Sequence, residues 1–225
     1  MFVFALKPFM AEYDSRHNLQ ILKLVKPITL YHLDESAAKA LMIEPLRGRI
    51  AVEQQAADYL YQITSGHPYL IQFFLQQIVD TVKGEHRPSI YKEDIKQFEE
   101  VMISEGPAYD AHFKVLDSDY SVADVMEPGR ARLGKGVLAL IAKIGNQEKE
   151  GWVPINRIQT ALTVHDCTFE DTDELLDQLL RAKILEEREI NGTLCFKISI
   201  PLLRKRYVRQ NLYSKYFRSL QKYAG

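Results

Sequence analysis

The chain has 225 residues and a formal net charge of −1, with 46% hydrophobic and 26% charged residues. The length suits one large domain or two small ones, the composition is that of a globular protein, and the near-zero charge gives the whole molecule no electrostatic preference for nucleic acid or anionic lipid. Two cysteines exclude a disulfide framework, and His165-x-Cys167 lacks the second pair of ligands that a zinc site needs, so we expect no metal.

The first part of the chain contains two short apolar runs, Phe2–Leu6 and Ile28–Leu33, each of which predicts a β-strand. The opening run is shorter than the roughly 20 residues that span a membrane, and it has neither a basic leader nor a cleavage site. We therefore expect a cytoplasmic protein with no transmembrane segment. Two strands alone are marginally stable, so they either pair with each other or belong to the edge of a larger sheet.

Residues 34–106 predict a small bundle of helices. Asp34 is a suitable N-cap for a short first helix, and Gly66 follows a second helix, where a left-handed cap is favoured. Pro68 is tolerated in the first turn of the next helix. That helix is apolar on almost every side and is therefore expected at the centre of the bundle. A further helix ends near Gly106.

The rest of the chain predicts a connector over 107–134, a second domain over 135–200 and a basic helix over 201–225. The second domain has three short helical stripes followed by a β-hairpin at Asn191-Gly192, a strong signal for such a turn. Three helices and a hairpin in this order are typical of a winged helix. The last helix is expected to begin at Pro201 and to run to the end. The predicted fold class is therefore mainly α.

One stretch, "GRARLGKG" at residues 129–136, has the Gly-x-x-x-x-Gly-Lys spacing of a P-loop. A P-loop needs a buried strand before its glycines and a hydroxyl residue after its lysine to hold Mg²⁺. Here an acidic stretch with a proline comes first, and Gly136 stands at the hydroxyl position. We interpret Gly129 and Gly134 as a linker glycine and a glycine at a helix start, and we expect no catalytic residue in this chain.

A longer stretch, "ITLYHLDESAAKALMIEPL" followed by "AADYLYQITSGHPYLIQFFLQQIV", resembles the lid of the signal-transduction ATPases with numerous domains. This AAA+-related group includes archaeal origin-recognition-like ATPases and apoptotic and immune ATPases. The resemblance rests on the core strand Ile28–Leu33, the helix over Glu35–Leu46, and Thr64-x-Gly66-x-Pro68 opening the central lid helix. A winged helix follows the lid in that family, and "FKISIPLLRKRYVRQ" resembles the family's wing strand and closing helix.

The resemblance implies a regulatory role in nucleotide binding. Residues 1–33 would be a remnant of an α/β ATPase core sheet, with Lys7 nearest to the sensor position. The lid residues that would face the nucleotide are Gly66, His67 and Pro68, with the proline against adenine and the histidine near base or phosphate. No Mg²⁺ motif precedes the lid, so ATP or ADP with Mg²⁺ is implied only beside a complete core. By itself the chain would bind no cofactor and would not be an enzyme, although the parent protein would be an ATPase.

Charge is distributed unevenly over the last third of the chain. The third helix of the predicted winged helix has five carboxylates against two bases, which opposes docking on DNA, and the wing adds three more: Glu170, Asp171, Asp173, Glu174, Asp177, Glu186, Glu187 and Glu189. By contrast, no acidic residue occurs from residue 201 onward, and the basic residues singled out there are Arg204, Lys205, Arg206 and Arg209. Such a helix suits nucleic acid, an acidic partner or an anionic membrane. It could equally pack its aromatic residues on the winged helix.

Three functions remain open at this point. The first is the regulatory C-terminal half of such an ATPase, in which the lid contacts adenine and the winged helix relays the nucleotide state or binds a protein partner. Its partners would be an ATPase core or other domains of the same protein. The second is a winged-helix nucleic-acid-binding regulator, which the acidic third helix disfavours. The third is a stand-alone protein-interaction module.

Overall fold

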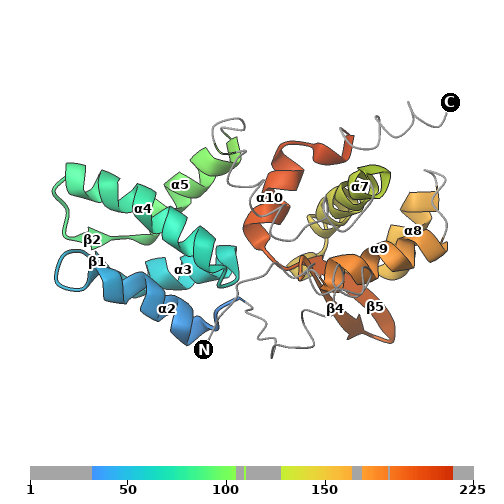
Figure 1. The fold of residues 1–225 in the computed structure, drawn as a ribbon, viewed down its shortest axis with the longest axis horizontal. Helices are drawn as coiled ribbons and strands as arrows, with labels where there is room; N and C mark the ends of the chain where they lie inside the picture. The colour runs from blue at the N-terminus through green and yellow to red at the C-terminus, as the bar shows by residue number, and fades with distance from the viewer. Residues whose placement is uncertain (1–31, 105–108, 110–127, 164–168, 182, 215–225) are drawn as a thin grey trace, which may run out of the picture. The chain divides into compact units, whose positions relative to one another are not determined.

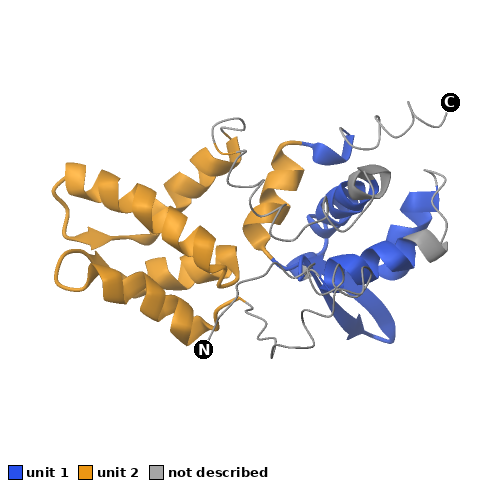
Figure 2. Ribbon diagram, in the orientation of Figure 1, with its two compact units in different colours: residues 1–30, 110–199, 211–225 blue, residues 31–109, 200–210 orange. Residues whose placement is uncertain are grey.

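Two compact units make up the part of the chain that the structure describes (Figure 2). The structure is a computed structural model, and it describes residues 32–104, 109, 128–163, 169–181 and 183–214. The helical unit takes its described residues from 31–109 and 200–210. The hairpin unit takes its described residues from 110–199 and 211–225. The predicted mainly helical fold class is confirmed. The predicted strand Phe2–Leu6 and most of Ile28–Leu33 lie outside the described residues.

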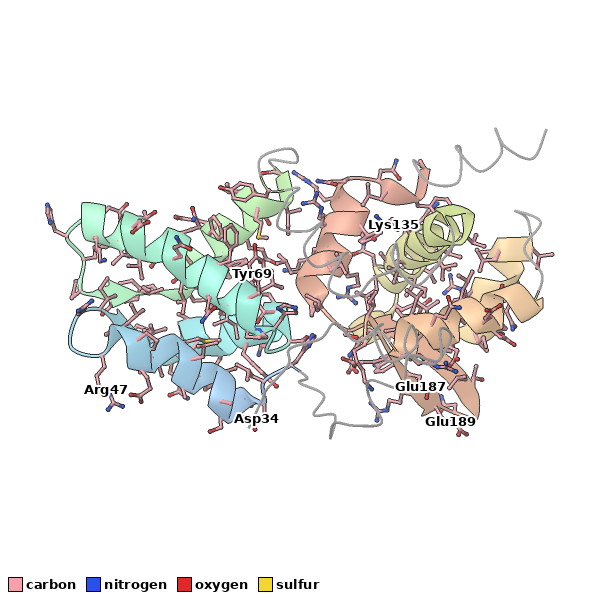
Figure 3. The ribbon with its side chains drawn as sticks, in the orientation of Figure 1. Asp34, Arg47, Tyr69, Lys135, Glu187 and Glu189 are labelled. Carbon is pink, nitrogen blue, oxygen red and sulfur yellow. The ribbon has the colours of Figure 1, made fainter. Side chains whose placement is uncertain are left out.

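In the described part of the helical unit, the helices α2 to α5 come from one continuous stretch and α10 comes from near the C-terminus (Figure 1). Its elements are α2 (Glu35–Ile43), η2 (Glu44–Leu46), β1 (Ala51–Val52), α3 (Gln54–Thr64), α4 (Pro68–Gly84), β2 (Ser89–Ile90), α5 (Lys92–Ser104) and α10 (Pro201–Arg209). Local signals place several ends correctly. Asp34 caps α2, as predicted, because its Oδ1 accepts a hydrogen bond from the Ala37 backbone N–H at 2.8 Å (Figure 3).

The helix α4, which its apolar sequence places at the centre of the bundle, packs against α2, α3 and α5, whereas α3 contacts α10 as well. Pro68 stands in the first turn of α4, and Leu70, Ile71 and Phe74 are completely buried. The strands β1 and β2 pair in parallel over two residues, with Ala51 opposite Ser89. Residues 51 and 52, just before α3, therefore belong to this short ladder.

The C-terminal helix α10 belongs to the helical unit, where it contacts α3 and α5. Its buried residues are Leu202, Leu203, Arg206 and Tyr207, two pairs spaced one turn apart along one side of the helix. The sequence groups residues 201–225 as a separate basic helix, and one alternative packs its aromatic residues on the winged helix. Tyr207 is buried in a helix of the helical unit, whereas the ring of Tyr213 lies beside α7, with its centroid 4.0 Å from Nζ of Lys143. The helix also ends earlier than predicted, since Asn211 has a left-handed φ of 47°.

The hairpin unit combines three helices with a three-stranded antiparallel sheet (Figure 1). Its elements are α7 (Pro128–Gly145), η3 (Lys149–Gly151), β3 (Val153–Pro154), α8 (Ile155–Thr163), α9 (Phe169–Arg181), β4 (Leu185–Ile190) and β5 (Thr193–Ile198). The strand order is β3-β5-β4, with Val153 opposite Phe196 and Leu185 opposite Ile198. The predicted hairpin is confirmed. Asn191 and Gly192 have φ of 51° and 75°, as a type I′ turn requires.

Two details of the hairpin unit differ from the sequence predictions. The first helix begins at Pro128, inside the predicted connector 107–134, so Gly129 is helical rather than a linker residue and Gly134 lies within the helix rather than at its start. Proline is compatible with a first helical turn, which is why it starts this helix instead of breaking it. In β5 the strict alternation expected of a half-buried strand also fails, because Cys195 is buried and Leu194 is exposed.

Candidate functional site

The turn between α3 and α4 is the most constrained piece of backbone in the helical unit. Ser65 and Gly66 both have left-handed φ, 49° and 74°. The backbone N–H of Leu33 donates a hydrogen bond to the Gly66 carbonyl oxygen at 2.9 Å. A Cβ at residue 66 would lie 2.1 Å from the carbonyl oxygen of Leu33, so the close approach of the two segments requires glycine. This turn fixes the entry of the chain into α4.

His67 comes next and is buried, with 8% of its surface exposed. Its backbone N–H donates to the Thr64 carbonyl oxygen at 3.1 Å. Its ring lies edge-on to the ring of His32, with centroids 5.1 Å apart. Burial, reinforced by the neighbouring His32, lowers the pKa of His67 to about 4. The ring is therefore a neutral part of the interior at pH 7 and offers little surface to a ligand.

Acidification is expected to destabilise the helical unit through His67. The folded-state pKa of about 4 is below the unfolded value of 6.5, so the folded state binds fewer protons and stability falls as pH drops from 6.5 toward 4. The whole loss is about 3 kcal/mol. Urea unfolding between these pH values should show a smaller decline for His67→Gln, while His86→Gln, which replaces an exposed histidine, should follow the wild type. If the free energy of unfolding fell equally with pH in all three proteins, the pH dependence could not be assigned to His67.

Pro68 and Tyr69 present partly exposed surface beside this turn. The ring of Tyr69 (labelled in Figure 3) is nearly parallel to that of Phe73, with centroids 6.3 Å apart and planes at 10°. Phe73 in turn contacts Phe98, with ring centroids 5.7 Å apart. The aromatic packing holds Tyr69 in one orientation. A flat heterocycle could lie against the proline and tyrosine at this place without rearrangement of the core.

The P-loop-like stretch lies inside α7. Its first residues stand in the first turn of α7, and from the second turn on the backbone N–H groups donate to the carbonyls four residues earlier instead of pointing into a loop. Lys135 (labelled in Figure 3) lies on this helix with its side chain partly exposed. Lys7, the predicted sensor residue, lies outside the described residues.

The four basic residues singled out near the C-terminus have different surroundings within α10. Arg206 is buried, and partial burial lowers the pKa of Arg204. The Nζ of Lys205 donates a hydrogen bond to Oε1 of Glu99 at 2.6 Å. Arg209 is exposed. The charge pattern of α10 is typical of a basic helix with all its charges in solvent. In the structure, one side of this helix is instead packed within the helical unit.

Acidic side chains of the hairpin unit lie on α9 and on the edge strand β4. Those on α9 that the structure describes as exposed are Asp173, Glu174 and Asp177, and those on β4 are Glu186, Glu187 and Glu189. Figure 3 labels two of the latter on the hairpin. Lys197 pairs with Glu186 at 3.2 Å. The electrostatic argument against DNA docking through α9 therefore applies to exposed carboxylates.

A polar cluster around Glu99 was not anticipated from the sequence. Glu99 is only 2% exposed, and its Oε2 accepts a hydrogen bond from the Tyr59 hydroxyl at 2.6 Å. Partial burial and this hydrogen bond raise the pKa of Tyr59 above its usual range. Lys205 binds the other carboxylate oxygen. A glutamate in an amphipathic helix gives no sign of such burial, and its lysine partner comes from another part of the chain.

Comparisons of this chain with protein-family models, with curated proteins and with solved structures give no match. Among the described side chains, no group of three or more histidine, cysteine, aspartate and glutamate residues is arranged to hold a metal ion. Over the same part of the chain, no helix is long and apolar enough to cross a bilayer.

Proposed function

We propose that this chain is the regulatory C-terminal half of an ATPase of the signal-transduction type, with the helical unit as its lid and the hairpin unit as a winged helix. The observation that carries the proposal is the turn from Thr64 to Pro68. A left-handed glycine pinned against Leu33 leads into a central helix that begins with proline. Pro68 and Tyr69 supply apolar surface beside it for a purine, which is recognised through area and shape.

The hairpin unit supports the winged-helix part of the proposal. The order α7, β3, α8, α9, β4, β5 and the sheet order β3-β5-β4 are those of three helices and a wing. The chain runs from Ile198 at the end of β5 to Pro201 at the start of α10 with two residues between them. A change in the wing can therefore reach the lid through a short covalent connection. We expect an open and a closed state of the lid. Nucleotide would favour the closed state because it makes different contacts in the two states.

Adenine nucleotides at millimolar concentration are expected to perturb only the α3–α4 turn of this chain, because nothing in the described residues cradles the triphosphate. In a ¹H–¹⁵N NMR titration, ADP should shift the signals of Leu33 and of residues 65–70, and inorganic triphosphate should not. Pro68→Ala should weaken these shifts several-fold. If this chain bound ATP with micromolar affinity and hydrolysed it, the proposal that the ATPase core is supplied elsewhere would be refuted. Signal shifts spread over both units would refute the assignment of the site to the α3–α4 turn.

A further inference from the structure

Three lysine side chains gather around one tyrosine ring in the helical unit. The Nζ atoms of Lys92, Lys96 and Lys205 lie 5.2, 6.0 and 5.9 Å from the centroid of the Tyr59 ring. Tyr59 belongs to α3, Lys92 and Lys96 stand one turn apart on α5, and Lys205 comes from α10. We call these four residues the Tyr59 cluster. Helices from distant parts of the chain thus bring three cations to one place.

The carboxylates near the Tyr59 cluster are of three kinds: one is held within the cluster, two are paired outside it, and Glu93 and Glu100 are exposed on α5. Glu99 is held by Tyr59 and Lys205. Asp58 pairs with Lys39 at 2.6 Å, and Asp94 pairs with Arg87 at 2.8 Å. Glu100, which also acts on Tyr59, is exposed at the next position of α5. The ion pairs of the described residues include neither Lys92 nor Lys96.

Lys205 and the α5 lysines therefore have different tasks. Lys205 neutralises a buried carboxylate, which is a structural role. Lys92 and Lys96 form a like-charge pair at i and i+4, an arrangement that costs a helix stability. A third ammonium group beside them increases the repulsion. The cation–π contacts with Tyr59 offset part of this repulsion, and an anion bound over the cluster would offset more of it.

The spacing of the cluster suits a closely charged polymer. Each ammonium group lies within about 6 Å of one centroid, so any two are separated by at most about 12 Å, over which one strand of B-form DNA presents three or four phosphates. The Tyr59 ring has lysines over it and is not an open platform for base stacking. Contacts from ammonium groups alone favour phosphates over bases, and such contacts carry no sequence information.

We propose that the Tyr59 cluster binds the phosphodiester backbone of a nucleic acid, with Lys92 and Lys96 as the principal contacts. The site lies on α3, α5 and α10 of the helical unit, whereas the acidic helix α9, with which a winged helix would dock on DNA, belongs to the hairpin unit. Binding is independent of nucleotide sequence and sensitive to salt. The proposal is separate from nucleotide binding at the α3–α4 turn and stands if that function fails.

The test measures binding of the full chain to a labelled DNA duplex of about 20 base pairs by fluorescence anisotropy, between about 50 and 200 mM salt. Lys92→Gln/Lys96→Gln removes two phosphate contacts, and glutamine keeps the helix intact. The slope of log affinity against log salt should become shallower by about 1.8, which corresponds to about 60-fold weaker binding at 0.1 M salt. Lys205 is left unchanged because its removal would leave the buried Glu99 carboxylate without a positive charge beside it and would destabilise the fold.

The matched control is Arg49→Gln/Lys83→Gln, which removes the same charge from exposed positions of the same unit. It should retain the wild-type salt slope. Equal losses in the two double variants, or no binding by the wild type at the lowest salt, would overturn the proposal. Binding to phosphatidylserine vesicles without binding to DNA would overturn it as well, since the ligand would then be a membrane surface. Circular dichroism melting should show that both variants are folded.

Discussion

Replacing Gly66 with alanine is expected to destabilise the helical unit by about 3 kcal/mol or more. Two effects combine at this position. A left-handed φ of 74° is unfavourable for a residue with a side chain, and the new Cβ would meet the Leu33 carbonyl oxygen at 2.1 Å. Either the hydrogen bond between residues 33 and 66 breaks or the start of α4 moves. The melting temperature should fall by at least about 6 °C.

Gly48 provides a matched control, because it has the same φ of 74° and no atom within 4 Å of an added Cβ. Gly48→Ala therefore reports the backbone cost alone, about 1 kcal/mol. Urea unfolding followed by circular dichroism gives both free energies, and amide exchange shows whether α3 and α4 open first. If the free energy of unfolding falls equally in the two variants, the close approach of Gly66 to Leu33 has no energetic role and does not constrain the turn.

Lys205→Met is expected to cost about 2 to 4 kcal/mol of stability. The variant leaves the Glu99 carboxylate, 2% exposed, with a hydrogen bond from Tyr59 but no positive charge. The loss is smaller than for a fully buried pair because 43% of the Lys205 side chain is exposed to water. Arg209→Met removes an exposed charge from the same helix and should change stability by less than about 0.5 kcal/mol.

A double variant separates the ion pair from the packing of α10. Glu99→Met/Lys205→Met has no buried charge, so it should be at least about 1 kcal/mol more stable than Lys205→Met alone. Urea unfolding of the wild type, both single variants and the double variant closes the thermodynamic cycle. A double variant less stable than Lys205→Met would mean that Glu99 stabilises the unit through Tyr59 rather than through Lys205.

Local signals in the sequence predicted much of the secondary structure. The cap at Asp34, the proline at the start of α4 and the Asn191-Gly192 turn each depend on residues a few positions apart, and each is found as predicted. The start of α7 at Pro128 was not predicted, because proline is compatible both with a chain break and with a first helical turn. The choice depends on whether the following residues continue the helix, and here they do.

The sequence was less informative about contacts between distant residues. Gly66 was singled out as a helix cap, but the carbonyl of Leu33 that requires a glycine there is set by tertiary packing. The parallel pairing of Ala51 with Ser89 covers only two residues and leaves no periodic pattern. Lys205 and Glu99 are 106 positions apart, and nothing in the charge pattern of α10 distinguishes a lysine that pairs internally from one in solvent.

The position of α10 in the chain has a consequence for synthesis on the ribosome. The helices α2 to α5 emerge first, but α10, which packs on α3 and α5, is translated only after α7, α8, α9 and the strands β3 to β5. At about 5 to 20 residues per second, Glu99 waits about 5 to 20 s before Lys205 has been added to the chain. During that interval the nascent bundle exposes the surface that α10 later covers. This is the period in which a chaperone would have most to bind.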